Sequence, residues 1–252
     1  MAENRKTYAQ VNDMQNKVIE ISLLGLAIGF IPVIPVLWIM YRWGMKTANT
    51  LYGLGRMLVQ LMIVGYFLAF IFNSSSLLLI SGILSVMLAA SSWIALNTIT
   101  EHRTTFLWNA FVAILLGGCS VLAIIISGVV QPSPWYSPQY VIPLAGMIFA
   151  NAMNAVSLSA ERMLSELRRG DDYLSARHTA FQAAMIPVTN SLFAVGIVSL
   201  PGMMTGQILS GVSPLIAARY QIVVMCMIYA SSGLSAAYFL WQSKKQFNTL
   251  SN

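Results

Sequence analysis

Long apolar runs separated by short polar connections make up most of the chain. A helix needs about 20 apolar residues to cross the hydrocarbon core of a bilayer, because each residue advances it by about 1.5 Å. Candidate runs cover residues 18–41, 51–72, 77–96, 106–130, 140–163, 183–200 and 214–241. The pattern predicts an all-α, polytopic membrane protein with about seven transmembrane helices.

Prolines add detail to two of these helices. Pro32 and Pro35 lie inside the first run, and proline lacks a backbone donor, so we expect that helix to be kinked. Ser213 and Pro214 stand in front of the last run, where a hydroxyl can cap a helix and proline suits its first position. The last helix is therefore expected to begin at Pro214.

Composition agrees with a membrane location. Hydrophobic residues make up 57% of the 252-residue chain and charged residues only 9%. Charged residues are about a quarter of a typical soluble domain. A soluble enzyme and a nucleic-acid-binding domain are therefore excluded, although the net charge is +6.

The basic residues are concentrated in alternate connections between the apolar runs. Cytoplasmic loops of membrane proteins carry the excess of lysine and arginine, so this alternation predicts an external N-terminus and a cytoplasmic C-terminus. The chain then divides into a polar N-terminal tail (1–17), a transmembrane domain (18–241) and a cytoplasmic C-terminal tail (242–252).

Sequence motifs for chemistry within this chain are missing. There is no Gly-x-x-x-x-Gly-Lys-Ser/Thr run to hold ATP, and no His-Glu-x-x-His or Cys-x-x-Cys pattern to hold zinc. The acidic residues fall in connections, in the tail or at helix ends, which disfavours a membrane-embedded enzyme. We expect no catalytic residue, metal-binding residue or cofactor in this chain.

Two amides in the fifth predicted helix are candidates for a translocation path. Asn151 and Asn154 share one helical face with Met147 and Leu158. Polar side chains at membrane depth face other helices or water. The two amides therefore either join helices by hydrogen bonds or line a path for cargo.

A second candidate segment follows the sixth predicted helix. Pro201 and Gly202 are expected to end that helix, because proline removes a donor and glycine tolerates unusual dihedral angles. Irregular polar backbone at membrane depth is tolerated only where it is buried in protein or lines water. The residues that follow are further candidates for the path: Met203, Met204, Thr205 and Gln207.

The fifth predicted helix ends in a cluster of charges. These residues are Glu161, Arg162, Glu166, Arg168 and Arg169. Such a cluster either anchors a helix at the membrane surface or forms a docking surface for a cytoplasmic partner.

Three segments of the sequence resemble a known family. They are FANAMNAVSLS, AVGIVSLPGMMTGQILSGVSPLIAARYQIVVM and, nearer the N-terminus, GRMLVQLMIVGYFLAFIF. The family is that of the FetB-type permeases, the membrane subunits of iron-export ABC transporters, to which the membrane subunits of plant aluminium-tolerance transporters are related. The resemblance covers roughly residues 20–240 and suggests a bacterial cytoplasmic (inner) membrane protein.

The resemblance implies a half-transporter. Two copies of the permease would form a homodimer, and separate ATPase subunits, which bind ATP and magnesium, would attach on the cytoplasmic side. The coupling segment would be about residues 161–178, which looks shorter here than in the family. The implied contact residues are Glu161, Glu166, Arg168, Arg169 and Arg177.

These observations leave several functions to compare. The first is export of an iron-like metal ion or a metal-linked small solute by an ABC permease. The second is a non-transporting membrane scaffold, which the shortened coupling segment favours. The third is a permease for an organic substrate such as a nucleotide sugar, because hard cations prefer oxygen ligands and the predicted spans offer only neutral amides, hydroxyls and thioethers.

Overall fold

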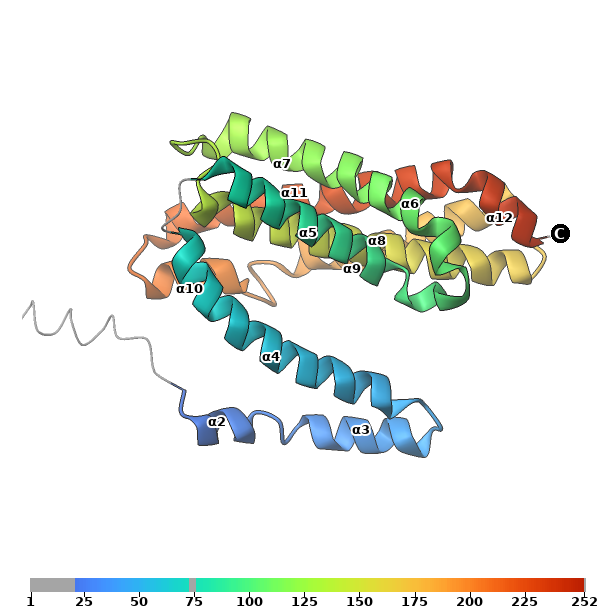
Figure 1. Cartoon of the computed structure of the whole chain (residues 1–252), viewed down its shortest axis with the longest axis horizontal. Helices are drawn as coiled ribbons and strands as arrows, with labels where there is room; N and C mark the ends of the chain where they lie inside the picture. Colours follow the sequence, from blue (N-terminus) through green and yellow to red (C-terminus); the bar gives the residue numbers. More distant parts are fainter. Residues whose placement is uncertain (1–20, 73–75, 252) are drawn as a thin grey trace, which may run out of the picture. The chain divides into compact units, whose positions relative to one another are not determined.

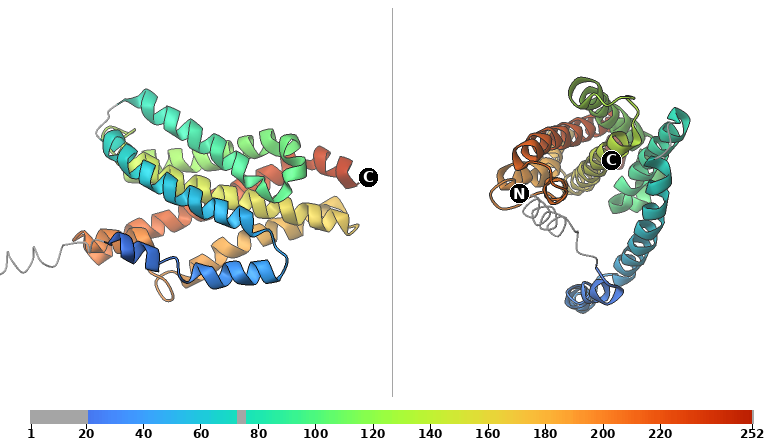
Figure 2. Two further views of the ribbon diagram at one scale, coloured as in Figure 1. Left: turned by 60° about the horizontal axis from the view of Figure 1, so that its bottom comes forward. Right: turned by 90° about the vertical axis from the view of Figure 1, so that its left-hand side faces the viewer.

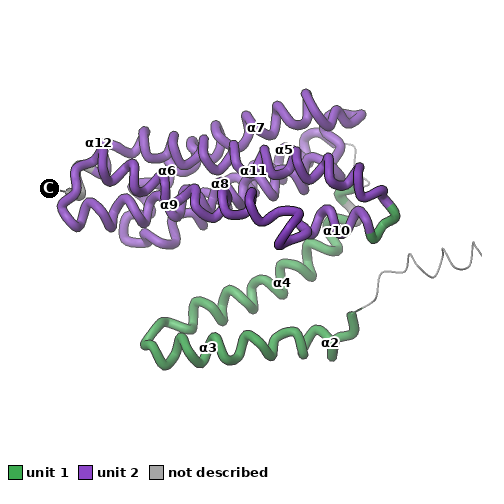
Figure 3. Tube along the Cα trace, turned by 180° about the vertical axis from the view of Figure 1, so that it is seen from behind, with its two compact units in different colours: residues 1–74, 209–211 green, residues 75–208, 212–252 purple. Residues whose placement is uncertain are grey.

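The computed structural model describes residues 21–72 and 76–251, and within these ranges the chain is helical with no strand (Figure 1). It separates into two compact units (Figure 3). Unit 1 comprises Met1–Ser74 and Leu209–Gly211, and unit 2 comprises Ser75–Ile208 and Val212–Asn252. The all-α prediction is thus met in the described chain, and each unit is considered separately.

Unit 1 contains α2 (Leu23–Ile28), α3 (Val33–Arg42) and α4 (Thr47–Phe72). The kink predicted in the first span is a break: α2 ends before Gly29, and α3 begins directly after Pro32. Gly44 adopts a left-handed φ of 71° between α3 and α4, a conformation that suits glycine. The most apolar windows of the two spans bury none of their residues.

Unit 2 is a helical bundle (Figure 2). Its first half runs through α5 (Leu77–Ala95), η1 (Asn97–His102), α6 (Arg103–Ile114), η2 (Leu115–Cys119), α7 (Ser120–Ile124) and η3 (Ile125–Val130). Its second half comprises α8 (Pro138–Arg168), α9 (Tyr173–Ala194), α10 (Gly202–Leu209), α11 (Pro214–Gln242) and α12 (Lys244–Ser251).

Helix α8 lies at the centre of this bundle and contacts α5, α9 and α11. Its core-facing side chains, among them Ile148, Phe149 and Val156, are at most 2% exposed. The π-helical segment η2 approaches α11 closely: a Cβ atom on Gly117 would lie 2.7 Å from the backbone nitrogen of Ser235. Only glycine fits at this crossing without a shift of one helix.

Six helical spans in the described ranges are long and apolar enough to cross a membrane, and two of them join consecutive elements: Leu23–Arg42 (α2 and α3) and Asn97–Val130 (η1 to η3). Helix α9 is not one of the six, which departs from the prediction of about seven. It begins ten residues earlier than the predicted run at 183–200 and ends at Ala194, so polar residues such as Arg177 and His178 fill its first turns. A seventh crossing by α9, and the orientation of the termini, stay predictions.

The charged residues of unit 2 gather at one end of the bundle. Figure 1 shows η1, the α8–α9 turn and α12 at this end, and α12 contacts both α8 and α9. Apart from Arg219, every charged residue of unit 2 lies on η1, at the start of α6, around the α8–α9 turn or on α12. We call this the basic end.

The C-terminal segment, treated above as a tail, contributes to the core of unit 2. On α12 the ring of Phe247 is fully buried, with its centroid 4.6 Å from that of Phe106 on α6. Phe239 on α11 completes this aromatic cluster. The cluster joins three helices at the basic end.

Candidate functional site

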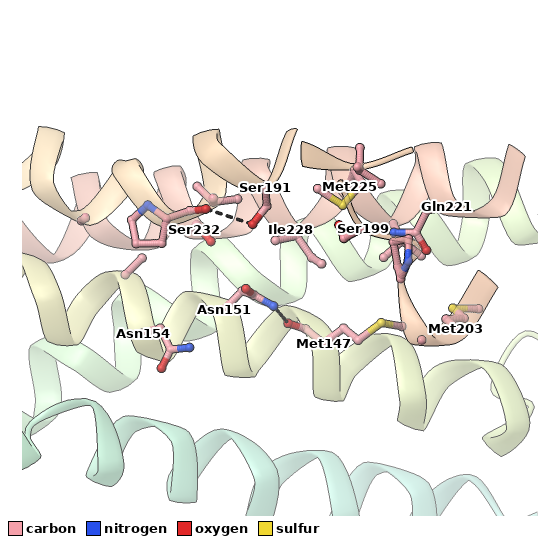
Figure 4. Close-up of a pocket in the computed structure, with 18 of the residues that line it drawn as sticks. Met147, Asn151, Asn154, Ser191, Ser199, Met203, Gln221, Met225, Ile228 and Ser232 are labelled. Atoms are coloured by element: carbon pink, nitrogen blue, oxygen red, sulfur yellow. Dashed lines mark hydrogen bonds between the residues drawn. The ribbon is translucent and has the colours of Figure 1, made fainter. Parts of the chain in front are cut away.

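A pocket of about 360 Å³ opens in unit 2 between α8, α9, α11 and the segment leading into α10 (Figure 4). No charged side chain lines it. Its polar lining consists of amides and hydroxyls: Asn151, Asn154, Ser191, Ser199, Gln221 and Ser232. Three thioethers also line it: Met147, Met203 and Met225. We call this the polar pocket.

Helix α8 supplies the two amides predicted from the sequence. The Nδ2 atom of Asn151 donates a hydrogen bond to the carbonyl oxygen of Met147 at 2.8 Å. Asn154 is exposed in the pocket lining, one helical turn from Asn151. Met147 and Leu158 line the same pocket, so the shared face predicted for these four residues is confirmed.

Gln221 on α11 is the polar residue of the pocket whose hydrogen bonding is incomplete. Its side chain is only 6% exposed, and its Oε1 atom has no hydrogen-bond partner in the described structure. A buried polar atom without a partner costs about 1–3 kcal/mol. The contribution of the Gln221 amide to stability therefore does not explain its presence in the pocket.

The α9 wall of the pocket is interrupted by proline. Pro187 has no backbone donor, so it cannot bond to the carbonyl oxygen one turn earlier in α9. The Pro187 carbonyl oxygen itself accepts a hydrogen bond from Ser191 Oγ at 2.9 Å, which Figure 4 shows as a dashed line. Both residues line the pocket, so α9 lacks one backbone hydrogen bond at the pocket wall.

The irregular segment after α9 differs from the one predicted. The helix ends at Ala194, and Gly196 follows with a left-handed φ of 84°. Pro201 and Gly202 stand at the start of α10 instead of ending the preceding helix, and the Pro201 carbonyl accepts the first helical bond from the Thr205 nitrogen at 3.0 Å. Proline's fixed φ suits a helix start, which explains the correction.

Only part of the second predicted path segment reaches the pocket. Met203 lines it together with Pro201 and Gly202, whereas Met204, Thr205 and Gln207 do not. Thr205 Oγ1 is bonded to the Pro201 carbonyl oxygen at 3.1 Å. The pocket touches α10 only at its first two residues, Gly202 and Met203, and the rest of the helix lies beyond it.

At the basic end, Glu166 organises the arginines around it. This carboxylate is buried and lies 2.5 Å from Arg162 Nη2 and 3.6 Å from Arg169 Nη1. The Arg168 guanidinium lies 4.0 Å from the carboxylate of Glu101 on η1, and both are well exposed. Glu166 therefore positions its neighbours, while Arg168 and Arg169 are the exposed groups.

A second pocket, of about 450 Å³, lies between η1 and the end of α8. It brings Glu101 and His102 of η1 together with Glu161, Arg168 and Arg169. Three of the five predicted partner-contact residues thus line one surface, and a fourth, Glu166, is buried beside it. The segment η1 adds Glu101 and His102 to this surface, which the sequence did not suggest. The α8–α9 turn contains Gly170, which has a φ of 93°, and Asp172. The Asp172 carboxylate accepts a hydrogen bond from the backbone nitrogen of Leu174 at 3.0 Å.

The fifth of the predicted partner-contact residues, Arg177, lies apart from this surface. It lines a third pocket, and its guanidinium lies 5.9 Å from the ring centroid of Tyr173. The Tyr173 hydroxyl donates to the carbonyl oxygen of Leu240 at 2.6 Å, which ties α9 to α11. Burial raises the pKa of the Tyr173 phenol, and the charge of Arg177 opposes that rise.

Two residues that the sequence analysis did not select are Gln221 and Arg219, both near the start of α11. Arg219 is exposed beside Val129 and Val130 of η3, away from the basic end. The signal for both was a polar residue inside an apolar run, which usually marks a functional position in a membrane protein.

Comparison with known proteins places these features in a family. Residues 21–248 match the family described as "Uncharacterised protein family (UPF0014)". A UPF0014 membrane protein of Synechocystis is 38% identical over 75% of this chain and 79% of its own. The "Probable iron export permease protein FetB" of Escherichia coli is 33% identical over 79% of this chain and 81% of its own. "Protein ALUMINUM SENSITIVE 3" of Arabidopsis thaliana is 29% identical over 77% of this chain and 76% of its own. No solved structure is significantly similar.

Proposed function

This chain belongs to the UPF0014 membrane protein family, and we propose that it is the permease subunit of an ABC transporter. In this proposal a separate ATPase binds at the basic end, which is cytoplasmic, and two copies of the chain form the transporter. The cargo is an iron-like metal ion in ligand-bound form or another metal-linked small solute. The relative named as a probable iron export permease supports export as the direction of transport and iron as the metal.

The observation that carries the proposal is the polar pocket with its buried, unpartnered Gln221. A pocket lined by amides, hydroxyls and thioethers offers both hydrogen-bond donors and acceptors but no fixed charge. Bare Fe(III) prefers charged oxygen ligands, whereas a complexed metal presents oxygen atoms and bound water that amides can recognise. The pocket chemistry therefore favours a chelated or hydrated metal over a bare one.

The geometry of α8 supports the coupling between ATPase and cargo. One continuous helix carries Asn154 in the polar pocket and Arg168 at the basic end. These residues are separated by about 21 Å along the axis at about 1.5 Å per residue. Displacement of the α8–α9 turn by a nucleotide-dependent partner would move the amides of the pocket, as alternating access requires.

Transport in sealed proteoliposomes tests this function. The full chain is reconstituted with an ABC ATPase that co-purifies with it, and ATP-dependent movement of iron citrate across the bilayer is measured. The expected result is movement that requires ATP and the ATPase and is lost in the Arg168→Glu/Arg169→Glu variant. Unchanged coupled ATPase activity and transport in that variant would remove the basic end from the mechanism.

An alternative, a non-transporting scaffold that retains the permease fold, has the compact α8–α9 turn in its favour. Only Arg169 to Asp172 separate the two helices. This alternative predicts a stable complex with a protein that carries no nucleotide-binding fold. A permease for an organic solute such as a nucleotide sugar is tested in the same liposomes with that solute in place of iron citrate.

A further inference from the structure

A groove between α9 and α11 at the basic end is separate from the polar pocket. It has a volume of about 280 Å³ and is lined by Arg177, His178 and Phe181 of α9 and by Ala237, Leu240 and Trp241 of α11. One side of this α9–α11 groove is cationic and the other is apolar. No carboxylate lines it.

Arg177 lines the groove and Lys244 lies near it at the start of α12, and neither has an acidic partner in the described structure. The ion pairs found there involve Arg162, Arg168 and Arg169, and neither Arg177 nor Lys244. The nearest acid along α9, Asp172, is engaged by the backbone nitrogens at the start of that helix. Positive charge at this groove is therefore available to an anion.

Tyr173 fixes the spacing of these cations. Its ring is close to both cations, with its centroid 5.9 Å from the Arg177 guanidinium carbon and 5.4 Å from Lys244 Nζ. Its hydroxyl is held by the Leu240 carbonyl oxygen at 2.6 Å, so the ring joins α9 to α11 at the floor of this region. The cationic side of the groove is thus organised by a shared aromatic ring and does not consist of unrelated surface charges.

The apolar side of the groove faces outward at the end of a membrane span. Trp241 is the penultimate residue of α11 and is 64% exposed, and Phe181 is also exposed. Tryptophan gathers at the membrane–water boundary, where its amphipathic ring fits. The cations next to it would stand at headgroup depth, and the aromatic residues would stand where acyl chains begin.

We propose that the α9–α11 groove binds an anionic phospholipid, with its phosphate at Arg177 and Lys244 and an acyl chain along Phe181 and Trp241. Basic pockets between transmembrane helices on the cytoplasmic side are suited to anionic headgroups. A cytoplasmic peptide would match the charge but not the apolar half, which lies on a membrane-spanning helix. The proposal rests on the bilayer location of the chain and on the cytoplasmic position of the basic end given under the proposed function, and it does not rest on transport.

Quenching of Trp241 by brominated lipids tests this site. The full chain is reconstituted in vesicles of phosphatidylcholine with 10 mol% of either brominated phosphatidylglycerol or brominated phosphatidylcholine. Subtracting the signal of the Trp241→Phe variant isolates this residue from the other tryptophans. We expect brominated phosphatidylglycerol to quench Trp241 several-fold more effectively than brominated phosphatidylcholine at equal content.

Matched variants identify the cations responsible. In Arg177→Gln/Lys244→Gln, the preference for phosphatidylglycerol should fall about fivefold for each charge removed. Arg219→Gln/Lys245→Gln removes the same charge outside the groove and should retain the preference. Arg177→Lys/Lys244→Arg keeps the charge and should also retain it, which separates charge loss from misfolding.

Three outcomes would overturn the proposal. Equal quenching by the two brominated lipids in the unmodified chain would show no selectivity for the anionic lipid. An equal loss of preference in both charge-removal variants would show a general effect of net charge. Displacement of the quenching lipid by millimolar inorganic phosphate would mean that the groove takes the free anion and not the lipid.

Discussion

Asn109 on α6 donates a hydrogen bond from Nδ2 to Ser243 Oγ, at the junction of α11 and α12, over 2.9 Å. Both side chains are buried, at 5% and 0% exposed, and they are 134 positions apart in the chain. The bond lies in the same region as the Phe106–Phe247 contact. The basic end is therefore held together by a polar contact as well as by aromatic packing.

Removing the acceptor of this bond should destabilise unit 2. Ser243→Ala leaves the Asn109 amide buried without a partner, which costs about 1–3 kcal/mol. The measurement is the free energy of unfolding in mixed micelles. Ser127→Ala removes only an exposed hydroxyl that bonds within its own helix, so it should change stability by under about 0.5 kcal/mol. Equal effects in the two variants would contradict the role of the buried pair.

Gly117→Ala should weaken the contact between η2 and α11. The added methyl group would meet the backbone of Ser235 at 2.7–3.0 Å, and backbone atoms cannot move aside as a side chain can. Overpacking of this kind costs about 1–3 kcal/mol or more. Thermal unfolding in detergent measures it.

Gly128→Ala is the matched control, because a Cβ there meets nothing within 4 Å inside the chain. It lies in the neighbouring π-helical segment η3, so local helix chemistry is similar. If the midpoint of thermal unfolding falls as much for Gly128→Ala as for Gly117→Ala, the effect arises in the π-helical backbone and not at the contact between η2 and α11.

Gln221→Met should separate function from stability. The substitution replaces a buried amide whose Oε1 atom lacks a partner with an apolar side chain of similar length. We expect unfolding stability to stay level or rise by about 1 kcal/mol, while ATP-dependent transport at low cargo concentration falls about tenfold, the effect of losing about 1.4 kcal/mol of binding. Proteoliposome transport and unfolding are measured on the same preparation.

The control for Gln221 is Tyr220→Phe, a change at the adjacent residue, which does not line the polar pocket. Transport should be retained in this variant. A Gln221→Met protein that transports normally but unfolds earlier would show that the amide serves packing and would remove it from the cargo site.

A charge exchange between η1 and α8 tests whether the surface at the basic end contacts a partner. Arg168 and Glu101 are 4.0 Å apart and exposed, and such pairs contribute under about 1 kcal/mol to stability. Arg168→Glu should therefore leave unfolding unchanged but reduce binding of the ATPase, measured by co-purification. The double exchange Arg168→Glu/Glu101→Arg restores the internal pair and should not restore binding. Recovery of binding in the double variant would assign the defect to the internal pair.

The sequence pattern predicted elements wherever a run was uniformly apolar. The run at 77–96 corresponds to α5 at Leu77–Ala95, and the run at 214–241 corresponds to α11 at Pro214–Gln242. Ser213 is at the N-cap of α11 as predicted, but its hydroxyl makes no capping hydrogen bond. Hydrophobicity locates a buried or lipid-facing helix, whereas side-chain orientation depends on neighbours that the pattern does not contain.

Helices with mixed composition were placed less well. The first turns of α9 carry Arg177 and His178, so a hydropathy window begins the helix too late. The polar segment after residue 241 forms α12 because one residue, Phe247, packs against rings from α6 and α11. Contacts between residues far apart in the chain decide both cases.

Some residues of the candidate site could be identified from the sequence and others could not. Asn151 and Asn154 were identified because their spacing places them on one helical face. Gln221 shares a face of α11 with the apolar Val224, Met225 and Ile228, so no polar neighbour at short helical spacing marks it, and the amides across the pocket come from α8. Glu166 was expected as a contact residue, but it is buried beside Arg162 and Arg169, an arrangement that charge alone could not indicate.

Between Asn151 and Arg168 helix α8 contains no proline and no break. This stretch is expected to move as a rigid body. A displacement of the α8–α9 turn would therefore reach the pocket without being absorbed by bending of the helix. Two backbone irregularities bound this stretch: Pro143 within α8 and Gly170, with its positive φ, in the α8–α9 turn. In the proposed transporter, these two positions would therefore set how far the pocket residues of α8 move.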